Sequence, residues 1–223
     1  MHKLNIAVID DGIQLDILQL LTGLATEVKC LQVLEGDCVA QYTHPIATVN
    51  HGTLCMALLI EYLERGACLD SVDISSLSIV NLEQAQTLTA LAVALHWCDD
   101  HRIDLVLMSI GVKSFVYGRS LLPVVEHART HLTIVAAAAN DDVITYPACW
   151  GGVIGVKYTP DIKAVSDTIC VQEAPRDGIE IEAWVAVGGV SASVAVRKKA
   201  TGYFLCAWAR ETENAVTAGC GAA

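Results

Sequence analysis

A histidine is followed by Gly and Thr and then by an apolar run in the segment Asn50-His51-Gly52-Thr53-Leu54-Cys55-Met56-Ala57. The run predicts a helix from Thr53 to about Arg65, so His51 is expected in the first turn or just before it. Gly52 has no side chain and would let another backbone or a substrate approach closely. A single histidine beside an apolar face is more often structural than functional, so its role depends on the rest of the chain.

Short apolar runs alternate with helical patterns along the whole sequence. Strands are predicted over 4–9, 27–34, 72–80, 103–108, 132–138 and 152–156, and helices over 16–24, 83–100 and 120–131. Pro123 is expected in the first turn of its helix, residues 35–49 and 159–183 are expected to be irregular, and a last helix is expected after Gly188-Gly189. The pattern predicts a three-layer α/β/α fold with a mostly parallel central sheet, as a single domain over 1–223.

Composition narrows the classes of partner. Of the 223 residues, 53% are hydrophobic and 17% are charged, which predicts one sizeable buried core. The formal net charge of −11 argues against nucleic acids and anionic membranes, because both require a basic surface. A neutral or basic peptide remains compatible with this charge.

Nine cysteines are scattered along the chain, mostly in apolar contexts and without a C-x-x-C pair. This distribution favours reduced thiols in the cytoplasm over a disulfide framework or a zinc site. The N-terminus has no signal-like apolar segment, and no apolar stretch is long enough to span a membrane. No metal or cofactor is expected, and the chain is expected to be cytoplasmic.

Three polar residues occur where predicted strands end or predicted helices begin, in the order Asp10, His51, Ser191. An aspartate at a strand end can accept the Nδ1 proton of a histidine and so fix its tautomer. The histidine can then remove the proton of a serine hydroxyl, which attacks a carbonyl carbon. The same order of these residue types is found in subtilisin.

Six sequence blocks resemble, in the same order, those of the subtilisin-like serine proteases (subtilases). The first three are Asp10-Asp11-Gly12, resembling Asp-Ser/Thr-Gly; residues 51–57, resembling His-Gly-Thr-x-Val-Ala; and residues 106–111, resembling Asn-Met-Ser-Leu-Gly. The others are residues 135–140, resembling Ala-Ala-Gly-Asn; Tyr146-Pro147-Ala148, resembling Tyr-Pro-Ala; and residues 189–192, resembling Gly-Thr-Ser-Met.

The resemblance implies a role for each of these positions. Asp10 would orient the base His51, Ser191 would be the nucleophile, and the Asn140 side chain would stabilise the oxyanion. An extended peptide substrate would pair with the backbone of Ser109, Ile110 and Gly111.

Several positions depart from the family pattern. Asp11 replaces the usual Ser or Thr and is interpreted as a solvated loop charge. Val190 and Ala192 replace the usual Thr and Met beside Ser191, which leaves Ser193 as an alternative nucleophile. The same changes leave open a second reading, in which the chain is a degenerate subtilase that binds a peptide without cutting it.

The resemblance extends to the small stand-alone subtilases of peptide-maturation systems, including the protease that removes the leader from the γ subunit of quinohemoprotein amine dehydrogenase. It implies a serine endopeptidase of narrow specificity. The expected partner is a peptide or protein substrate, such as a leader peptide.

Overall fold

The computed structural model describes residues 3–24, 27–34, 38–41, 50–79, 84–139, 143–158, 169–172 and 175–183. Within them the helices are α1 (Leu15–Thr22), α2 (His51–Arg65), α3 (Gln84–Asp100) and α4 (Phe115–Ala128), with a short 3-10 helix over Leu69–Ser71. The strands are β1 (Leu4–Asp10), β2 (Val28–Leu34), β3 (Cys38–Gln41), β4 (Val72–Ser78), β5 (Leu105–Met108), β6 (Thr133–Ala137), β7 (Ile154–Tyr158), β8 (Ile169–Val171) and β9 (Ile181–Ala183).

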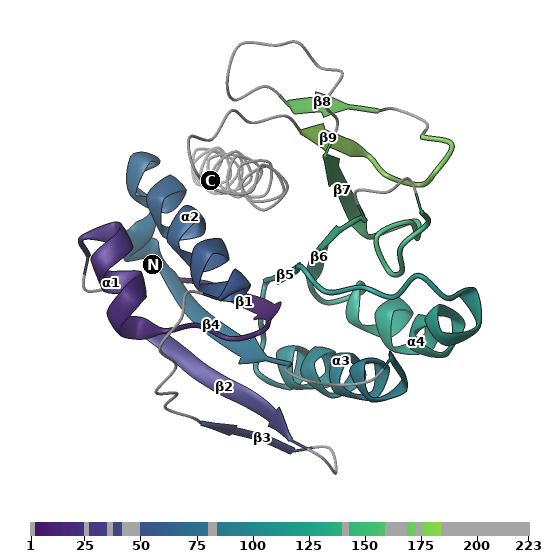
Figure 1. Ribbon diagram of the computed structural model, residues 1–223, viewed down its shortest axis with the longest axis horizontal. Coiled ribbons are helices and arrows are strands. Elements are labelled where there is room, and N and C mark those ends of the chain that lie inside the picture. Colours follow the sequence, from purple (N-terminus) through teal and green to yellow (C-terminus); the bar gives the residue numbers. More distant parts are fainter. Residues whose placement is uncertain are drawn as a thin grey trace, which may run out of the picture.

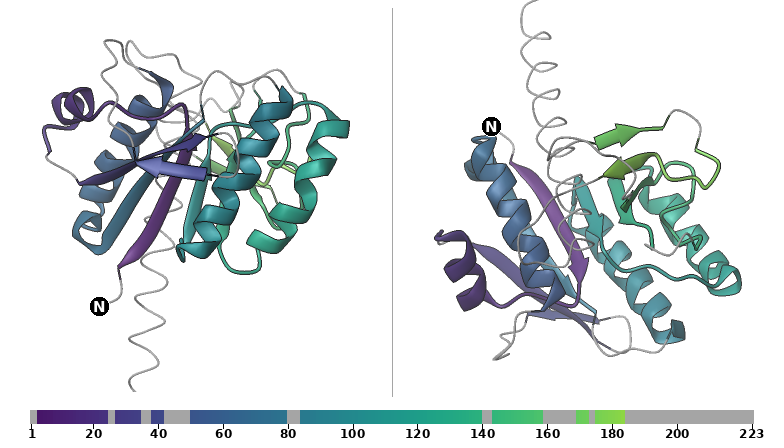
Figure 2. Two further views of the ribbon diagram at one scale, coloured as in Figure 1. Left: turned by 90° about the horizontal axis from the view of Figure 1, so that it is seen from below. Right: turned by 45° about the horizontal axis from the view of Figure 1, so that its top comes forward.

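In the described part of the chain, the strands form one 9-stranded sheet in the order β3-β2-β4-β1-β5-β6-β7-β9-β8. The inner strands are parallel to one another, whereas the edge strands β3 and β8 are antiparallel to their neighbours. Helices α1 and α2 cover one face of the sheet, and α3 and α4 cover the other (Figures 1 and 2). The predicted three-layer α/β/α fold with a mostly parallel sheet is therefore confirmed.

Strand β1 lies between β4 and β5, and its apolar side chains are buried on both faces of the sheet. Such a strand has a nearly continuous apolar sequence, as Leu4–Asp10 does up to its last residue. Ile6 and Val8 pack with α2, whereas Ala7 and Ile9 pack with α3 and α4. Because successive side chains alternate between the two faces, Asp10 is directed to the side of α2.

Helix α4 begins at Phe115, earlier than the expected start at Ser120. Pro123 therefore lies inside the helix and not in its first turn, so that prediction is wrong. A proline cannot donate a hydrogen bond to the carbonyl four residues earlier, which here belongs to Arg119. Both residues are exposed, so water can bind that carbonyl while Leu121 packs on the opposite, buried face.

Short strands occur in two regions that were expected to be irregular. Residues 35–49 include β3, and residues 159–183 include β8 and β9. Strands of three or four residues are too short for an apolar period to identify them. The other expected elements are confirmed with shifts at their ends, except the helix after Gly188, which lies outside the described residues. None of the described helices has the length and apolar character that crossing a membrane requires.

Candidate active site

Asp10 and His51 meet at the carboxyl end of β1. Asp10 ends the strand and is only 2% exposed, and His51 is the first residue of α2. The Nδ1 atom of His51 lies 2.8 Å from Oδ2 and 2.9 Å from Oδ1 of Asp10. Because an ionised carboxylate can only accept hydrogen bonds, Nδ1 is the protonated nitrogen in this pair. In the neutral imidazole, Nε2 is then the nitrogen that can accept a proton.

Two polar side chains hold the start of α2. Asn50 is the N-cap residue, and its side-chain oxygen accepts a hydrogen bond from the backbone N–H of Thr53 at 3.2 Å. The carboxylate of Asp11 accepts from the backbone N–H of His51 at 3.2 Å and of Gly52 at 2.6 Å. These contacts satisfy amide donors that the first turn of a helix leaves unpaired. They fix the end of α2 and, with it, the position of His51.

Asp11 is not the solvated loop charge that the sequence suggested. Its side chain is half-buried, and the amide of Asn50 donates to its Oδ1 at 3.1 Å in addition to the two backbone contacts. Burial raises the pKa of Asp11, the N–H of Gly52 opposes that effect, and the charge of Asp10 adds to it. The interpretation failed because the sequence alone does not reveal that the loop after β1 folds back over the start of α2.

Gly52 lies directly against the loop that follows β1. A Cβ atom at this position would stand 2.1 Å from the carbonyl oxygen of Gly12, which is backbone and cannot swing away. Gly12 itself has a φ of 89°, in the left-handed region that favours glycine. The expected close approach of another backbone at Gly52 is therefore confirmed, and that backbone belongs to the chain itself.

Cys55 contacts both members of the pair, which the sequence analysis did not anticipate. Its Sγ atom donates to Oδ2 of Asp10 at 2.7 Å and lies 3.3 Å from Nδ1 of His51. The sequence contained a signal for the contact with His51. Cys55 follows His51 by four residues, and residues four apart share one face of a helix. Oxygen, nitrogen and sulfur ligand atoms of the three residues also lie within 4.8 Å of one another, so they could hold a metal ion.

The surroundings of Asp10 keep its carboxylate ionised. Burial alone would raise the pKa of Asp10, but the hydrogen bond and charge of His51 lower it. Hydrogen bonds from Cys55 and Ser109 contribute in the same direction, and the resulting pKa is about 2. The site therefore holds a buried negative charge that can orient the imidazole and stabilise its protonated form.

Ser109 follows β5 and reaches the same carboxylate. Its backbone N–H donates to the carbonyl of Ile9 at 3.2 Å, which continues the pairing of β5 with β1. Ser109 was expected to contact substrate through its backbone. Its hydroxyl also donates to the carbonyl of Ile9 at 3.4 Å, and from there it helps to lower the pKa of Asp10.

Ile110 and Gly111 continue from Ser109 along the same edge of the sheet. They lead to an isolated antiparallel bridge in which Val112 and Tyr146 exchange backbone hydrogen bonds of 2.9 and 2.8 Å. A Cβ atom at Gly111 would lie 2.8 Å from the carbonyl oxygen of Tyr146, so the segment is packed tightly on that side.

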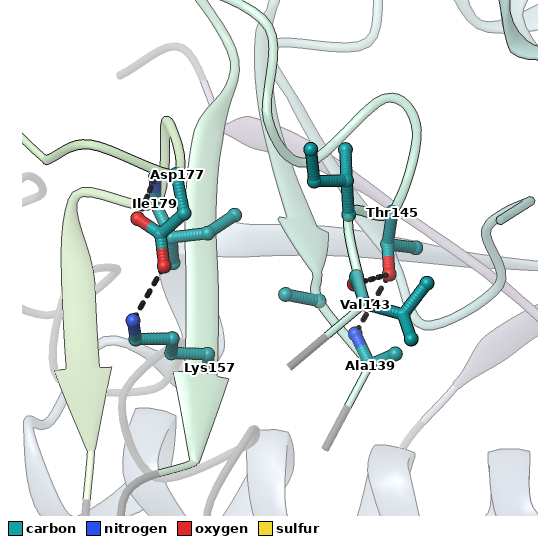
Figure 3. Close-up of a pocket in the computed structure, with 8 residues that line it drawn as sticks. Ala139, Val143, Thr145, Lys157, Asp177 and Ile179 are labelled. Carbon is teal, nitrogen blue, oxygen red and sulfur yellow. Dashed lines mark hydrogen bonds and ion pairs between the residues drawn. The ribbon is translucent and has the colours of Figure 1, made fainter. Parts of the chain in front are cut away.

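A small pocket opens beside the end of β6 (Figure 3). Thr145 shapes one wall, since its hydroxyl accepts from the N–H of Ala139 at 2.9 Å and donates to the carbonyl of Val143 at 3.1 Å. On the opposite wall, Nζ of Lys157 lies 2.5 Å from Oδ2 of Asp177, and this pairing raises the pKa of the lysine. The lining residues are Ala138, Ala139, Val143, Ile144, Thr145, Lys157, Asp177 and Ile179.

The remaining sequence-predicted residues, Asn140, Ser191 and the alternative Ser193, lie outside the described residues. Asn140 directly follows Ala139, which lines the pocket. The structure thus brings together Asp10, His51 and Ser109, and adds Asn50, Asp11 and Cys55 around them. Chemically, a buried carboxylate hydrogen-bonded to an imidazole provides a general base.

Neither a protein-family model nor a curated protein sequence matches the chain. Among solved structures, it is similar to one described as S41 psychrophilic protease, with 16% identity, a TM-score of 0.58, and coverage of 95% of this chain and 78% of that one. It is also similar to a lanthipeptide protease, with 14% identity, a TM-score of 0.50, and coverage of 84% of this chain and 56% of that one. The chain thus spans little more than half of the lanthipeptide protease. At such identities the likeness shows a shared fold.

Proposed function

We propose that residues 1–223 form a single subtilisin-like serine endopeptidase domain of narrow specificity. The observation that carries the proposal is the pairing of His51 Nδ1 with the buried Asp10 at 2.8 Å, at the carboxyl edge of a parallel sheet. Open α/β sheets bind their ligands outside this edge. The pairing uses Nδ1, so Nε2 would take the proton of a serine hydroxyl, and the His51 side chain is 31% exposed to solvent.

Ser191 is the proposed nucleophile. Its oxygen would attack the carbonyl carbon of the scissile peptide bond while His51 removes its proton, and the ionised Asp10 would stabilise the imidazolium that forms. The side chain of Asn140 and the backbone N–H of Ser191 would donate hydrogen bonds to the oxyanion. His51 would then pass the proton to the leaving amine, and water would hydrolyse the acyl-enzyme.

The substrate would lie along Ser109, Ile110 and Gly111 as an added strand, held by main-chain hydrogen bonds. The pocket beside Ala139 would receive one of its side chains. Its two charged lining residues, Lys157 and Asp177, are paired with each other. We therefore expect a neutral side chain at this position of the substrate, because a charged one would have to compete with that pair.

A peptide leader is the proposed substrate, and the cytoplasm is the proposed location. The similarity in fold to a lanthipeptide protease supports a role in peptide maturation. Within that class, the motif variants resemble those of the protease that processes the γ subunit of quinohemoprotein amine dehydrogenase. A purified enzyme that degraded casein as readily as a candidate leader would contradict narrow specificity.

Labelling with a fluorophosphonate probe tests the nucleophile directly. Wild type, Ser191→Ala and Ser193→Ala are compared, and the labelled peptide is mapped by mass spectrometry. Loss of label only in Ser191→Ala supports the proposal, whereas loss only in Ser193→Ala moves the nucleophile by two residues. A folded wild type that takes no label would favour the alternative suggested by Val190 and Ala192, a peptide-binding module without activity.

A further inference from the structure

Two histidines and an aspartate form a cluster at the carboxyl ends of α3 and α4. Nε2 of His127 lies 3.1 Å from Oδ2 of Asp99, and Nδ1 of His131 lies 3.2 Å from Oδ1 of the same residue. One ligand atom from each residue lies within 4.8 Å of those of the other two. The cluster is separate from the candidate active site and has no part in the proposed reaction.

The backbone holds both histidines on one face. His127 lies in the last turn of α4, and the chain continues to turn beyond it, with hydrogen bonds from the N–H of Thr130 to the carbonyl of His127 and from the N–H of His131 to that of Ala128. Residues four apart on such a turn point in the same direction. The two imidazole centroids are accordingly 5.2 Å apart. Asp99 reaches them from the end of α3, which packs against α4.

The spacing suits a transition-metal ion. A tetrahedral zinc ion with bonds of about 2.0–2.1 Å sets its ligand atoms about 3.3 Å apart. Each imidazole nitrogen lies near this distance from one oxygen of Asp99, His127 from Oδ2 and His131 from Oδ1. A single ion between the two nitrogens would therefore bind both carboxylate oxygens, or one of them after a small rotation of the carboxylate. Imidazole nitrogen favours zinc over calcium or magnesium, which prefer oxygen ligands. The two imidazoles are more than half exposed, so water can complete the coordination.

The electrostatic setting also favours a cation. Asp99 and Asp100 are the last residues of α3, and the last turn of that helix contains no basic residue. A carboxylate at the carboxyl end of a helix is unfavourable, because the helix dipole is negative there. The end of α4 adds a second negative dipole at the same place. A divalent ion would neutralise both helix ends together with Asp99.

We infer that Asp99, His127 and His131 form a binding site for a divalent transition-metal ion, with zinc as the best-fitting ion. Helix α3 ends just before β5 begins, and β5 runs parallel to β1 with Met108 beside Ile9. The cluster is therefore at the edge of the sheet opposite to Asp10. A bound ion would join α3 to α4 and stabilise the fold without touching the substrate.

Isothermal titration of the full, metal-free chain with Zn²⁺ tests the site, with a parallel measurement of the melting temperature. We expect saturable binding and a melting temperature that rises with Zn²⁺ concentration. His127→Ala and His131→Ala should each lose that binding event and that rise. His96→Ala is the matched control, because His96 is an exposed histidine on α3 outside the cluster, and it should bind as wild type does.

Cys55→Ser removes the thiol from the second group of residues that could hold zinc, which comprises Asp10, His51 and Cys55. The proposal requires the binding event to persist in Cys55→Ser. Loss of binding in Cys55→Ser with retention in both histidine variants would overturn it. It would also be overturned if wild type bound no Zn²⁺, since the cluster would then be only a set of polar contacts between the ends of the two helices.

Discussion

The Sγ atom of Cys55 lies 2.7 Å from Oδ2 of Asp10, the oxygen that also faces His51 at 2.8 Å. One carboxylate oxygen therefore serves two donors from the same helix, placed one turn apart. Both donors lower the pKa of Asp10. The Cys55 thiol therefore contacts Asp10 and the proposed base His51, and it is not simply one of the thiols of the apolar core.

The thiol hydrogen bond can be measured by comparing two variants at Cys55. A hydrogen bond to a charged group contributes about 1.5–3 kcal/mol, so Cys55→Ala should lower the free energy of unfolding by about 2 kcal/mol in urea titrations at pH 7. Cys55→Ser keeps a donor and should lose less. Equal losses in the two variants would show that the packing of sulfur, and not its hydrogen bond, is what matters.

The low pKa of Asp10 makes stability depend on pH in acid. The group has a pKa of about 2 in the folded chain and an ordinary value of 3.8, so the folded state favours the ionised form. This stabilisation is fully present above pH 4 and is lost as the pH falls towards 2, with a magnitude of about 2 kcal/mol. Urea unfolding at a series of pH values should reveal it. Asp10→Asn removes the titrating group, so a loss of the same size in that variant would contradict the assignment.

Gly52 should tolerate no side chain. In Gly52→Ala the new methyl group meets the Gly12 carbonyl, and we expect a loss of about 3 kcal/mol or more, at the upper end of overpacking costs. Gly151→Ala is the matched control, because a Cβ atom there has nothing within 4 Å. Thermal unfolding of both variants gives the comparison. A Gly52→Ala protein as stable as Gly151→Ala would mean that the loop and α2 are not in contact.

Asp10 should affect the reactivity of the proposed nucleophile strongly, because it holds the proposed base His51. Asp10→Asn presents an amide that can hold the imidazole in the wrong tautomer, and we expect fluorophosphonate labelling to slow by about 10⁴-fold. The labelling rate of folded protein, checked by circular dichroism, is the measurement. A change of less than tenfold would remove Asp10 from the proposed triad.

The sequence predicted the meeting of Asp10 and His51 because both predictions rest on strong local signals. A continuous apolar strand ends in Asp10, and an apolar helical run begins beside His51. The carboxyl ends of parallel strands and the starts of the following helices share one edge of the sheet. Residue types and their order were therefore enough for this part of the site.

The contacts of Asp11 and Cys55 depend on tertiary packing that no local pattern contains. Asp11 bonds the start of α2 only because the loop at Gly12 turns back onto that helix. Nothing in the sequence distinguishes Cys55 from the other eight cysteines as a contact of Asp10. That contact arises because α2 packs on the sheet with Cys55 facing the end of β1. The start of α4 was misplaced for a different reason. A proline is ordinarily disfavoured inside a helix, but here the Arg119 carbonyl that loses its partner is on the exposed side, where water can bind it.

Both sheet neighbours of β1 come much later in the chain, with Leu4 opposite Val72 and Ile6 opposite Leu105. Although Asp10 and His51 are made early, β1 has both of its sheet neighbours only once the segment through Met108 has been synthesised. Such distant pairings are slow to form, because long loops must close first. The end of β1, and with it the Asp10–His51 pair, therefore reaches its final surroundings only after both of these later strands have been made.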